Sequence, residues 1–207
     1  AENLRFDARE ESGNVKYAKE LIKGFDLYVF DAFGVSHRNH TSVIFIPEYL
    51  PTVTGIQFYK EITILKKLLK KPKLPFVFIL GGGKAETKIP LIDPISERVS
   101  VIIAGGKIPL EMNYEDHPNR KLIIGELRED KKDLSDAAME QFERFIVQAE
   151  TIVWNGPMGM YEDPEARKGT AYIADCVART RGFKIIGGGD TEAAVTALGI
   201  DQEKAFT

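Results

Sequence analysis

The residues with the clearest chemical meaning follow a short apolar run. Residues 76–88 read FVFILGGGKAETK, so three glycines and then two lysines, Lys84 and Lys88, come directly after it. The run predicts a buried strand and the glycines predict a turn. A glycine turn that opens into a helix offers free backbone N–H groups to an anion, and lysines four residues apart share one helix face. The segment therefore predicts a phosphate site, with an ordinary turn and solvated lysines as the alternative.

Glycine turns recur after three other apolar runs. Residues 101–106 read VIIAGG, residues 151–159 read TIVWNGPMG and residues 184–191 read KIIGGGDT. Several strands that end at glycines are typical of an open parallel sheet, whose ligands bind outside the carboxyl ends of the strands. Asp190 follows one of these turns, and a carboxylate there is a suitable oxygen ligand for Mg²⁺. Together, the turns, the lysine pair and the acid indicate a nucleotide site.

The elements that would hold this site alternate along the chain. From residue 76 onward we expect strands at 76–80, 99–103, 121–125, 151–154 and 184–187, and helices at 84–92, 135–149, 165–180 and 191–198. This alternation predicts an α/β fold with a doubly wound parallel sheet. The segment 107–120 interrupts the pattern because it contains no convincing helix. Before residue 76 we expect a helix at 15–23, a strand at 27–30, a loop at 36–42, a connector at 44–50 and a helix at 54–71.

Composition narrows the classes of function. The chain has 207 residues, of which 43% are hydrophobic and 29% are charged, as in a globular protein of one large or two small domains. Its net charge of −3 gives no support to a nucleic-acid partner, and no apolar run suits a membrane span. A single cysteine, Cys176, fits a reducing compartment and a place in the core. We therefore expect a cytoplasmic protein without a signal peptide.

Five blocks, in order along the chain, resemble phosphoglycerate kinase: ENLRF at 2–6, DAFGVSHRNH at 31–40, LGGGKAETKI at 80–89, VWNGPMG at 153–159 and IGGGDT at 186–191. The resemblance covers nearly the whole chain and weakens between about residues 106 and 137. It implies two doubly wound α/β domains joined by a helix. It also implies an enzyme of glycolysis that moves a phosphoryl group between 1,3-bisphosphoglycerate and ADP, with Mg²⁺ as the magnesium–nucleotide complex.

The resemblance implies that this chain contains only part of the two-domain fold of the family. Residues 1–48 are expected to be the C-terminal portion of the acid-substrate domain, 49–71 the linking helix region and 72–207 a shortened nucleotide-binding domain. The opening strand and loop of the family, the helix that covers the adenine after Gly106 and the closing segment have no counterpart. These residues are therefore expected to be the retained part of a longer chain, and a naturally reduced paralogue is the alternative.

The resemblance also implies roles for individual residues. Arg5, His37 and Arg38 would hold 3-phosphoglycerate, since arginine binds carboxylate and phosphate oxygens in pairs. Arg38 and Lys84 would be catalytic, and Asp190 would be the Mg²⁺ ligand. Glu162 would bind the ribose, and Gly105 and Gly106 would form the floor of the adenine pocket. The complete set of expected nucleotide-binding residues is Gly82, Gly83, Lys84, Lys88, Gly105, Gly106, Asn155, Glu162, Gly188, Gly189, Asp190 and Thr191.

Other functions remain open at this point. Because segments of the family are absent, the alternative to a kinase is a catalytically inactive protein of this family that serves as a nucleotide-binding remnant or a scaffold. A dinucleotide oxidoreductase is disfavoured, because no Gly-x-Gly-x-x-Gly turn is followed by a ribose-binding acid. A metal site at His37 and His40 is disfavoured, because there are only three histidines and no nearby cysteine. The expected partners are ATP or ADP and the two phosphoglycerates, and the expected state is a monomer.

Overall fold

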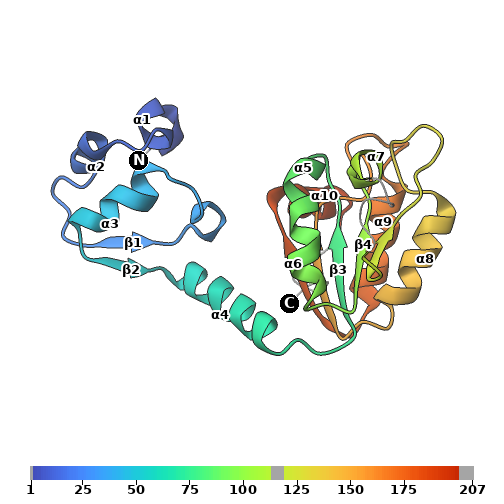
Figure 1. The fold of residues 1–207 in the computed structure, drawn as a ribbon. Coiled ribbons are helices and arrows are strands. Elements are labelled where there is room, and N and C mark those ends of the chain that lie inside the picture. Colours follow the sequence, from blue (N-terminus) through green and yellow to red (C-terminus); the bar gives the residue numbers. More distant parts are fainter. Residues whose placement is uncertain (1, 113–118, 201–207) are drawn as a thin grey trace. The chain divides into compact units, whose positions relative to one another are not determined.

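Two compact units make up the chain. The computed structural model describes residues 2–112 and 119–200, and it divides the chain into Ala1–Lys71 and Pro72–Thr207. Figure 1 shows both units and the helix that ends the first. The assignment of one unit to the acid substrate and of the other to the nucleotide stays a prediction.

A five-stranded parallel sheet forms the centre of the second unit. Its strands are β3 (Phe76–Leu80), β4 (Val101–Ala104), β5 (Leu122–Ile124), β6 (Thr151–Asn155) and β7 (Phe183–Gly187). Their order is β5-β4-β3-β6-β7, and every neighbouring pair is parallel. The chain moves outward from β3 to β5 in one direction and from β6 to β7 in the other. The boundary between β3 and β6 is therefore the switch point at which open α/β sheets bind ligands.

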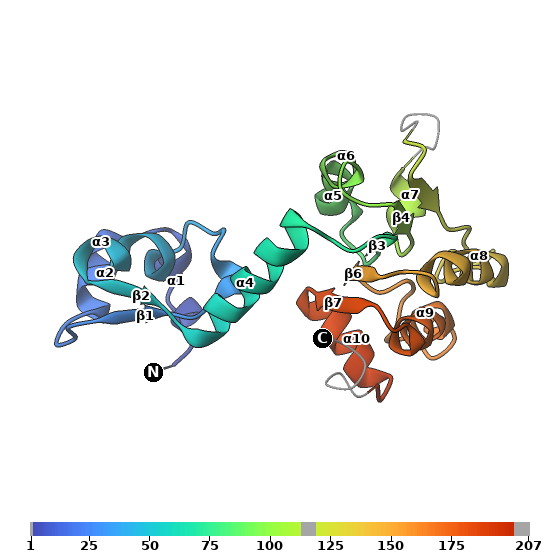
Figure 2. The same cartoon turned by 90° about the horizontal axis from the view of Figure 1, so that it is seen from below.

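Helices cover both faces of this sheet. The helices are α5 (Ala85–Lys88), α6 (Ile92–Ser96), α7 (Ile108–Glu111), α8 (Asp136–Ile146), α9 (Lys168–Arg179) and α10 (Gly189–Ala197). Figures 1 and 2 show α5 and α6 on one face, and α8 and α9 on the other. The expected α/β fold with a doubly wound parallel sheet is thus confirmed.

The main core lies between the sheet and the pair α8 and α9. Phe142 and Ile146 of α8 and Trp154 of β6 are fully buried there. Every residue of β4 is buried, as expected for a parallel strand covered on both faces. Cys176 of α9 is also fully buried, and this burial raises the pKa of its thiol to about 11. The cysteine is therefore a core residue, as the sequence suggested, and not a reactive one.

The first unit is smaller and mostly helical. Its elements are η1 (Leu4–Phe6), α1 (Ala8–Glu11), α2 (Val15–Leu21), β1 (Tyr28–Phe30), η2 (Phe33–Val35), η3 (Thr41–Phe45), α3 (Ile46–Tyr49), β2 (Thr52–Thr54) and α4 (Ile56–Lys70). Strands β1 and β2 form a short parallel pair. The Asp31 carboxylate accepts a hydrogen bond at 2.6 Å from the N–H of Phe58, in the first turn of α4. That acid therefore caps the long helix.

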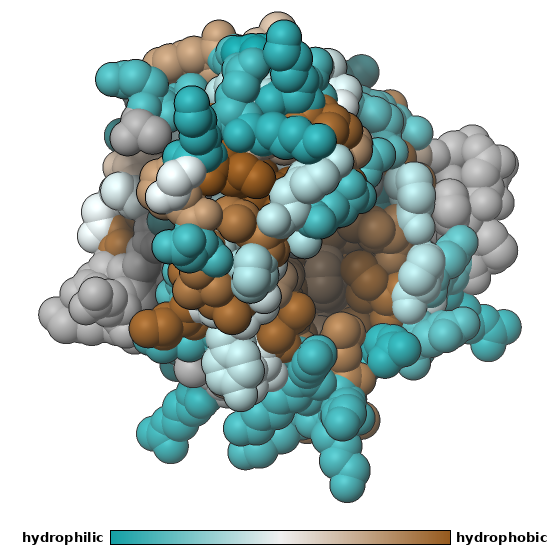
Figure 3. Space-filling model, turned by 90° about the vertical axis from the view of Figure 1, so that its left-hand side faces the viewer, coloured by the Kyte–Doolittle hydropathy of each residue, from teal (hydrophilic) through white to brown (hydrophobic). Residues whose placement is uncertain are grey.

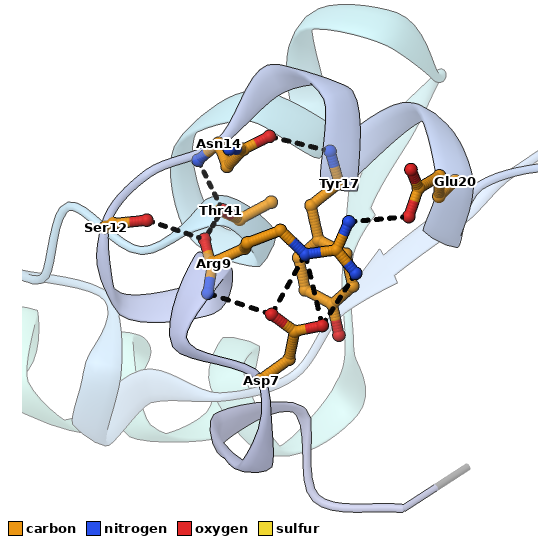
Figure 4. Close-up of polar contacts among 7 residues, drawn as sticks. All are labelled: Asp7, Arg9, Ser12, Asn14, Tyr17, Glu20 and Thr41. Carbon is orange, nitrogen blue, oxygen red and sulfur yellow. Dashed lines mark hydrogen bonds and ion pairs between the residues drawn. The ribbon is translucent and has the colours of Figure 1, made fainter.

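Arg9 and Thr41 connect the helices of the first unit (Figure 4). The Arg9 guanidinium donates to the carboxylate of Asp7 at 2.7 Å and to that of Glu20 at 2.8 Å, and it lies 4.4 Å from the centre of the Tyr17 ring. Hydrogen bonds from Arg9 lower the pKa of Asp7 to about 2. The Thr41 hydroxyl donates to the carbonyl of Arg9 at 2.7 Å. These contacts tie α1 to α2 and to η3.

Large apolar side chains of the first unit remain exposed. Ile56 and Tyr59 of α4 are 76% and 63% exposed, and Val29 and Val53 of the strand pair are about half exposed. Figure 3 shows brown hydrophobic residues among the teal hydrophilic ones on the face that it displays. The helix expected at 54–71 is confirmed over Ile56–Lys70, but several of its apolar residues are not buried within this unit.

The structure differs from the sequence-based expectation in five segments. The expected loop and connector at 36–50 contain η3 and α3, and β2 lies where the helix at 54–71 was expected to begin. The expected helix at 84–92 is divided into α5, a 3₁₀ turn at Ile89–Leu91 and α6, because prolines at 90 and 94 lack the N–H of a continuous helix. The single turn α7 lies within the segment in which no helix was expected.

Phe142→Ala should destabilise the second unit by about 3–5 kcal/mol, because it leaves a cavity between α8 and the sheet. The chain has one tryptophan, Trp154, which lies in the same core, so its fluorescence during denaturant titration follows this unit alone. Glu140→Ala, at an exposed position of the same helix, should change the free energy of unfolding by no more than about 0.5 kcal/mol. Equal losses in the two variants would contradict the assigned core.

Candidate functional site

A pocket lies at the switch point of the sheet. It has a volume of about 290 Å³ and crosses the carboxyl ends of β7, β6, β3 and β4. The residues that line it are Gly82, Gly83, Gly106, Lys107, Leu110, Lys131, Lys132, Pro157, Gly159, Met160, Tyr161, Glu162 and Asp190. This is the position at which doubly wound sheets bind their ligands.

Tightly packed turns form the base of the pocket. The N–H of Gly82 donates to the carbonyl of Pro157 at 2.6 Å, and the carbonyl of Gly82 accepts from the N–H of Lys107 at 3.0 Å. Gly82 has a φ of +91°, and a side chain at Gly106 would lie 2.4 Å from its nitrogen. Glycine is required at both positions, because a Cβ atom would separate the turns. The turn after β3 is thus fixed to those after β4 and β6.

Lys88 fastens the same turns from the helix side. Its ammonium donates to the carbonyl of Gly81 and, at 3.3 Å, to the carbonyl of Asn155. These carbonyls stand at the ends of β3 and β6. Burial lowers the pKa of Lys88, and the negative charge of Asp190 acts in the opposite direction. Lys88 is therefore a half-buried cation between the two strands that flank the switch point.

Thr191 joins β6 and β7 behind the pocket. Its hydroxyl donates to the carbonyl of Gly187 at 2.7 Å and accepts from the N–H of Gly156 at 2.7 Å. The side chain is fully buried. The first bond ties the start of α10 to the end of β7, and the second ties it to the turn after β6. This places Asp190, the preceding residue, at the pocket with an exposed carboxylate.

Two acidic residues, Glu162 and Asp190, line the pocket. Desolvation is the main cause that raises the pKa of Tyr161, and the charges of Glu162 and Asp190 raise it further. No group of three or more His, Cys, Asp or Glu side chains that could enclose a metal occurs in residues 2–112 and 119–200. One accessible carboxylate suits Mg²⁺, which keeps several waters and takes other ligands from phosphates. The donor set at Asp190 thus fits a magnesium–nucleotide complex.

Three lysines also line the pocket, and the sequence analysis did not single them out. Lys107 follows the turn after β4, and Lys131 and Lys132 belong to the loop between β5 and α8. The Lys132 ammonium forms an ion pair with Asp163 at 3.1 Å. Lys131 has a φ of +58°, which is uncommon for a residue with a side chain. No local motif marks these lysines, because the fold brings them to the pocket from separate loops.

The expected nucleotide-binding residues fall into two groups. Gly82, Gly83, Gly106, Glu162 and Asp190 line the pocket. The others surround it without being among its lining residues: Lys84, Lys88, Gly105, Asn155, Gly188, Gly189 and Thr191. Lys84 is exposed immediately before α5, and Gly105 is buried. The functional roles of both groups stay predictions.

The expected acid-substrate residues lie in the first unit. Arg5 belongs to η1, and His37 and Arg38 follow η2; all three side chains are exposed. Within the described residues, no hydrogen bond or ion pair joins these three side chains. His40 is buried instead, with its Nδ1 atom 3.9 Å from the carboxylate of Glu10. That carboxylate also accepts hydrogen bonds from the hydroxyl and the N–H of Ser42.

The helices in the described part of the chain are all too short or too polar to cross a membrane.

Comparisons with known proteins agree on one family. The family model described as phosphoglycerate kinase matches residues 1–118 and 113–207. The phosphoglycerate kinase of Dictyoglomus turgidum is 33% identical over 251 residues, which cover 98% of this chain and 63% of the relative. The enzyme of Borrelia garinii is 32% identical, with 98% and 64% covered. The alignments are longer than the 207 residues of this chain, so these relatives contain residues without a counterpart here.

Solved structures give the same result. Phosphoglycerate kinase from Coxiella burnetii is 27% identical and has a TM-score of 0.78, with 99% of this chain and 65% of that chain covered. The enzyme from Pyrococcus horikoshii is 22% identical with a TM-score of 0.81, which shows the fold alone. The chain spans just under two thirds of the length of these proteins. On the family match over its whole length, the chain belongs to the phosphoglycerate kinase family.

Proposed function

We propose that this protein transfers a phosphoryl group between 1,3-bisphosphoglycerate and ADP, and that its second unit binds the nucleotide. The observation that carries the proposal is the pocket at the switch point, where the turns after β3 and β4 meet Asp190 in a chain of this family. Relatives named phosphoglycerate kinase support the reaction, and the sheet topology supports the place of the nucleotide.

The phosphates of the nucleotide belong beside the turn after β3. Gly82 and Gly83 line the pocket there, and Lys84 and Lys88 follow at the next helix. Asp190 stands in the first turn of α10, where the N–H groups of Gly189 and Asp190 precede the first hydrogen bonds of the helix, which Thr191 and Glu192 donate to the carbonyl of Gly188. Two lysines and a helix start offset the negative charge of a polyphosphate. The ribose then falls near Glu162, whose carboxylate accepts hydrogen bonds from hydroxyl groups.

Asp190 would hold the Mg²⁺ of the nucleotide complex. The ion would supply charge neutralisation on the transferring phosphoryl group. The chain's own residues position that group. Lys84 would stabilise its equatorial oxygens, because a phosphoryl transfer needs in-line placement and electrostatic support but no covalent nucleophile. Thr191 and Lys88 would keep the surrounding turns rigid, so that these groups need no rearrangement during the reaction.

The acid substrate belongs to the first unit. Arg5, His37 and Arg38 expose two guanidinium groups and an imidazole, and none of these forms an ion pair within the described residues. Such groups bind carboxylate and phosphate oxygens. We propose that they hold 3-phosphoglycerate and that Arg38 also contacts the reacting group. We also propose that the protein is a cytoplasmic monomer and that neither nucleic acid nor a membrane is among its partners.

A coupled phosphoglycerate kinase assay, combined with the intact mass of the purified protein, tests the reaction. Activity in material with a mass well above 23.2 kDa would mean that these residues act within a longer enzyme. Activity at 23.2 kDa would assign the reaction to this chain alone. Absence of turnover in both the 23.2 kDa chain and a longer form of the protein, with nucleotide still bound, would overturn the kinase proposal.

Lys84→Ala should lower kcat by at least about a hundredfold while the Kd for the magnesium–nucleotide complex changes by less than about fivefold, because its charge acts on the transition state. Steady-state kinetics and calorimetry separate the two quantities. Lys84→Arg keeps the charge and serves as the matched control. A loss in affinity as large as the loss in kcat would show that Lys84 only helps to bind the nucleotide.

Asp190→Asn should weaken the magnesium–nucleotide complex and leave the affinity for nucleotide without metal unchanged or increased, because it removes a metal ligand and a negative charge. Calorimetric titrations with and without Mg²⁺ measure both. Glu140→Gln removes one charge from an exposed position on α8 and is the control. If the Mg²⁺ dependence of Asp190→Asn equals that of the unaltered protein, Asp190 is not a ligand.

Nucleotide binding should take up a proton at alkaline pH. Burial lowers the pKa of Lys88 in the free protein, and a nearby phosphate favours the charged ammonium and raises this pKa again. Above the lowered pKa, binding therefore protonates Lys88. Calorimetry at alkaline pH in two buffers of different ionisation enthalpy measures the uptake. Lys88→Arg stays charged and should abolish it; an undiminished uptake in this variant would assign the proton to another group.

A further inference from the structure

Glu10 of α1 carries a carboxylate that is almost completely buried, with an exposed fraction of 3%. Burial of a charged carboxylate is costly unless hydrogen bonds replace its hydration. Its Oε1 atom accepts from the hydroxyl of Ser42 at 2.6 Å, and its Oε2 atom accepts from the N–H of Ser42 at 3.1 Å. Both oxygens therefore bind a single residue that lies 32 positions further along the chain.

Ser42 is held through its carbonyl group as well. This carbonyl accepts a hydrogen bond from the hydroxyl of Tyr28 at 3.0 Å. Desolvation is the main cause that raises the pKa of Tyr28, and the negative charge of Glu10 raises it further. The buried His40 precedes Ser42, and its Nδ1 atom lies 3.9 Å from the Glu10 carboxylate. Glu10 thus fixes the start of η3 against α1 and, through Ser42, against β1.

Thr41 joins the same two helical segments through neutral groups. Its hydroxyl donates to the carbonyl of Arg9 at 2.7 Å and accepts from the N–H of Asn14 at 2.7 Å (Figure 4). Neither bond involves the carboxylate of Glu10. The contact between α1 and η3 therefore does not depend on Glu10 alone, whereas the hydroxyl and N–H of Ser42 bind only that carboxylate among the described residues.

The two joined segments carry the residues that are expected to bind the acid substrate. Arg5 lies in η1, just before α1, while His37 and Arg38 lie between η2 and Ser42. Basic groups that grip one carboxylate or phosphate must keep a defined separation, because charge-assisted hydrogen bonds of this kind are directional. The bonds between Glu10 and Ser42 connect the segment of Arg5 to the segment of the other two residues.

We propose that Glu10 is a positioning residue for the acid substrate, and that it acts through Ser42 to set the place of His37 and Arg38 relative to Arg5. This role rests on the proposed function, which assigns these three residues to 3-phosphoglycerate. Glu10 itself does not need to touch the substrate. Its two hydrogen bonds hold the segment in place before the substrate arrives, so that less ordering has to accompany binding.

Glu10→Gln keeps the size of the side chain but leaves one acceptor for the two donors of Ser42. The Kd for 3-phosphoglycerate, measured by calorimetric titration, should rise about tenfold, because misplaced groups bind the substrate less well. The Kd for the magnesium–ADP complex should change by less than about twofold, because the change is remote from the second unit.

Asn14→Ala is the matched control for a general loss of stability in the same unit. It removes the side-chain cap of α2, where Asn14 accepts from the N–H of Tyr17 at 2.9 Å, and it leaves the bonds of Ser42 intact. This variant should lower the unfolding temperature and leave the Kd for 3-phosphoglycerate unchanged. An equal rise in Kd in Asn14→Ala and Glu10→Gln would overturn the inference, since affinity would then follow the stability of the unit.

A double-mutant cycle tests whether Glu10 acts through Ser42. Ser42→Ala removes the hydroxyl donor and should also raise the Kd for 3-phosphoglycerate. Because both changes act on one contact, the double variant should raise this Kd no further than the more severe single variant does. Effects that multiply in the double variant would show that the two residues act separately, and would contradict the proposed route.

The remaining outcomes separate this inference from the proposed function. If the unaltered protein and Glu10→Gln bind 3-phosphoglycerate equally tightly, Glu10 has no positioning role and the site of the proposed function still stands. If the unaltered protein does not bind 3-phosphoglycerate, the assignment of the acid substrate to the first unit fails and this inference fails with it.

Discussion

The close packing of the glycine turns at the carboxyl ends of β3 and β6 is the constraint on which the site depends. A side chain at Gly156 would lie 2.1 Å from the carbonyl oxygen of Gly81, so the two backbones touch. The N–H of Gly81 also donates to the carbonyl of Asn155 at 2.9 Å. The Lys88 ammonium donates to the carbonyls of Gly81 and Asn155, and the Thr191 hydroxyl accepts from the N–H of Gly156. The turns that line the pocket are therefore held in place by backbone contacts that only glycine permits.

The sequence predicted the second unit well because its signals are local. Apolar runs that end in glycines identified the strands, and the alternation with helices identified a parallel sheet. Five of the expected nucleotide-binding residues, Gly82, Gly83, Gly106, Glu162 and Asp190, line the observed pocket. Glycine turns and the residues directly after them are visible in sequence because the backbone conformation itself requires particular residue types.

The sequence could not predict contributions that depend on contacts between distant segments. Lys131 reaches the pocket from the loop after β5, and nothing in its neighbours distinguishes it from a solvated lysine. Thr191 was expected to face a nucleotide, yet its hydroxyl is used within the protein, since β6 and β7 lie side by side. The short strand β2 was overlooked because its pairing with β1 is set by tertiary contacts and by no alternation of its own.

The single cysteine has a practical consequence. Cys176 is fully buried and its thiolate is disfavoured, so it reacts slowly with alkylating reagents at neutral pH. A cysteine introduced at an exposed position would therefore accept a probe selectively in an otherwise unmodified chain. Pairs of spin labels or dyes, one on each compact unit, would then report the distance distribution between the units in solution and any change in it on addition of ligands.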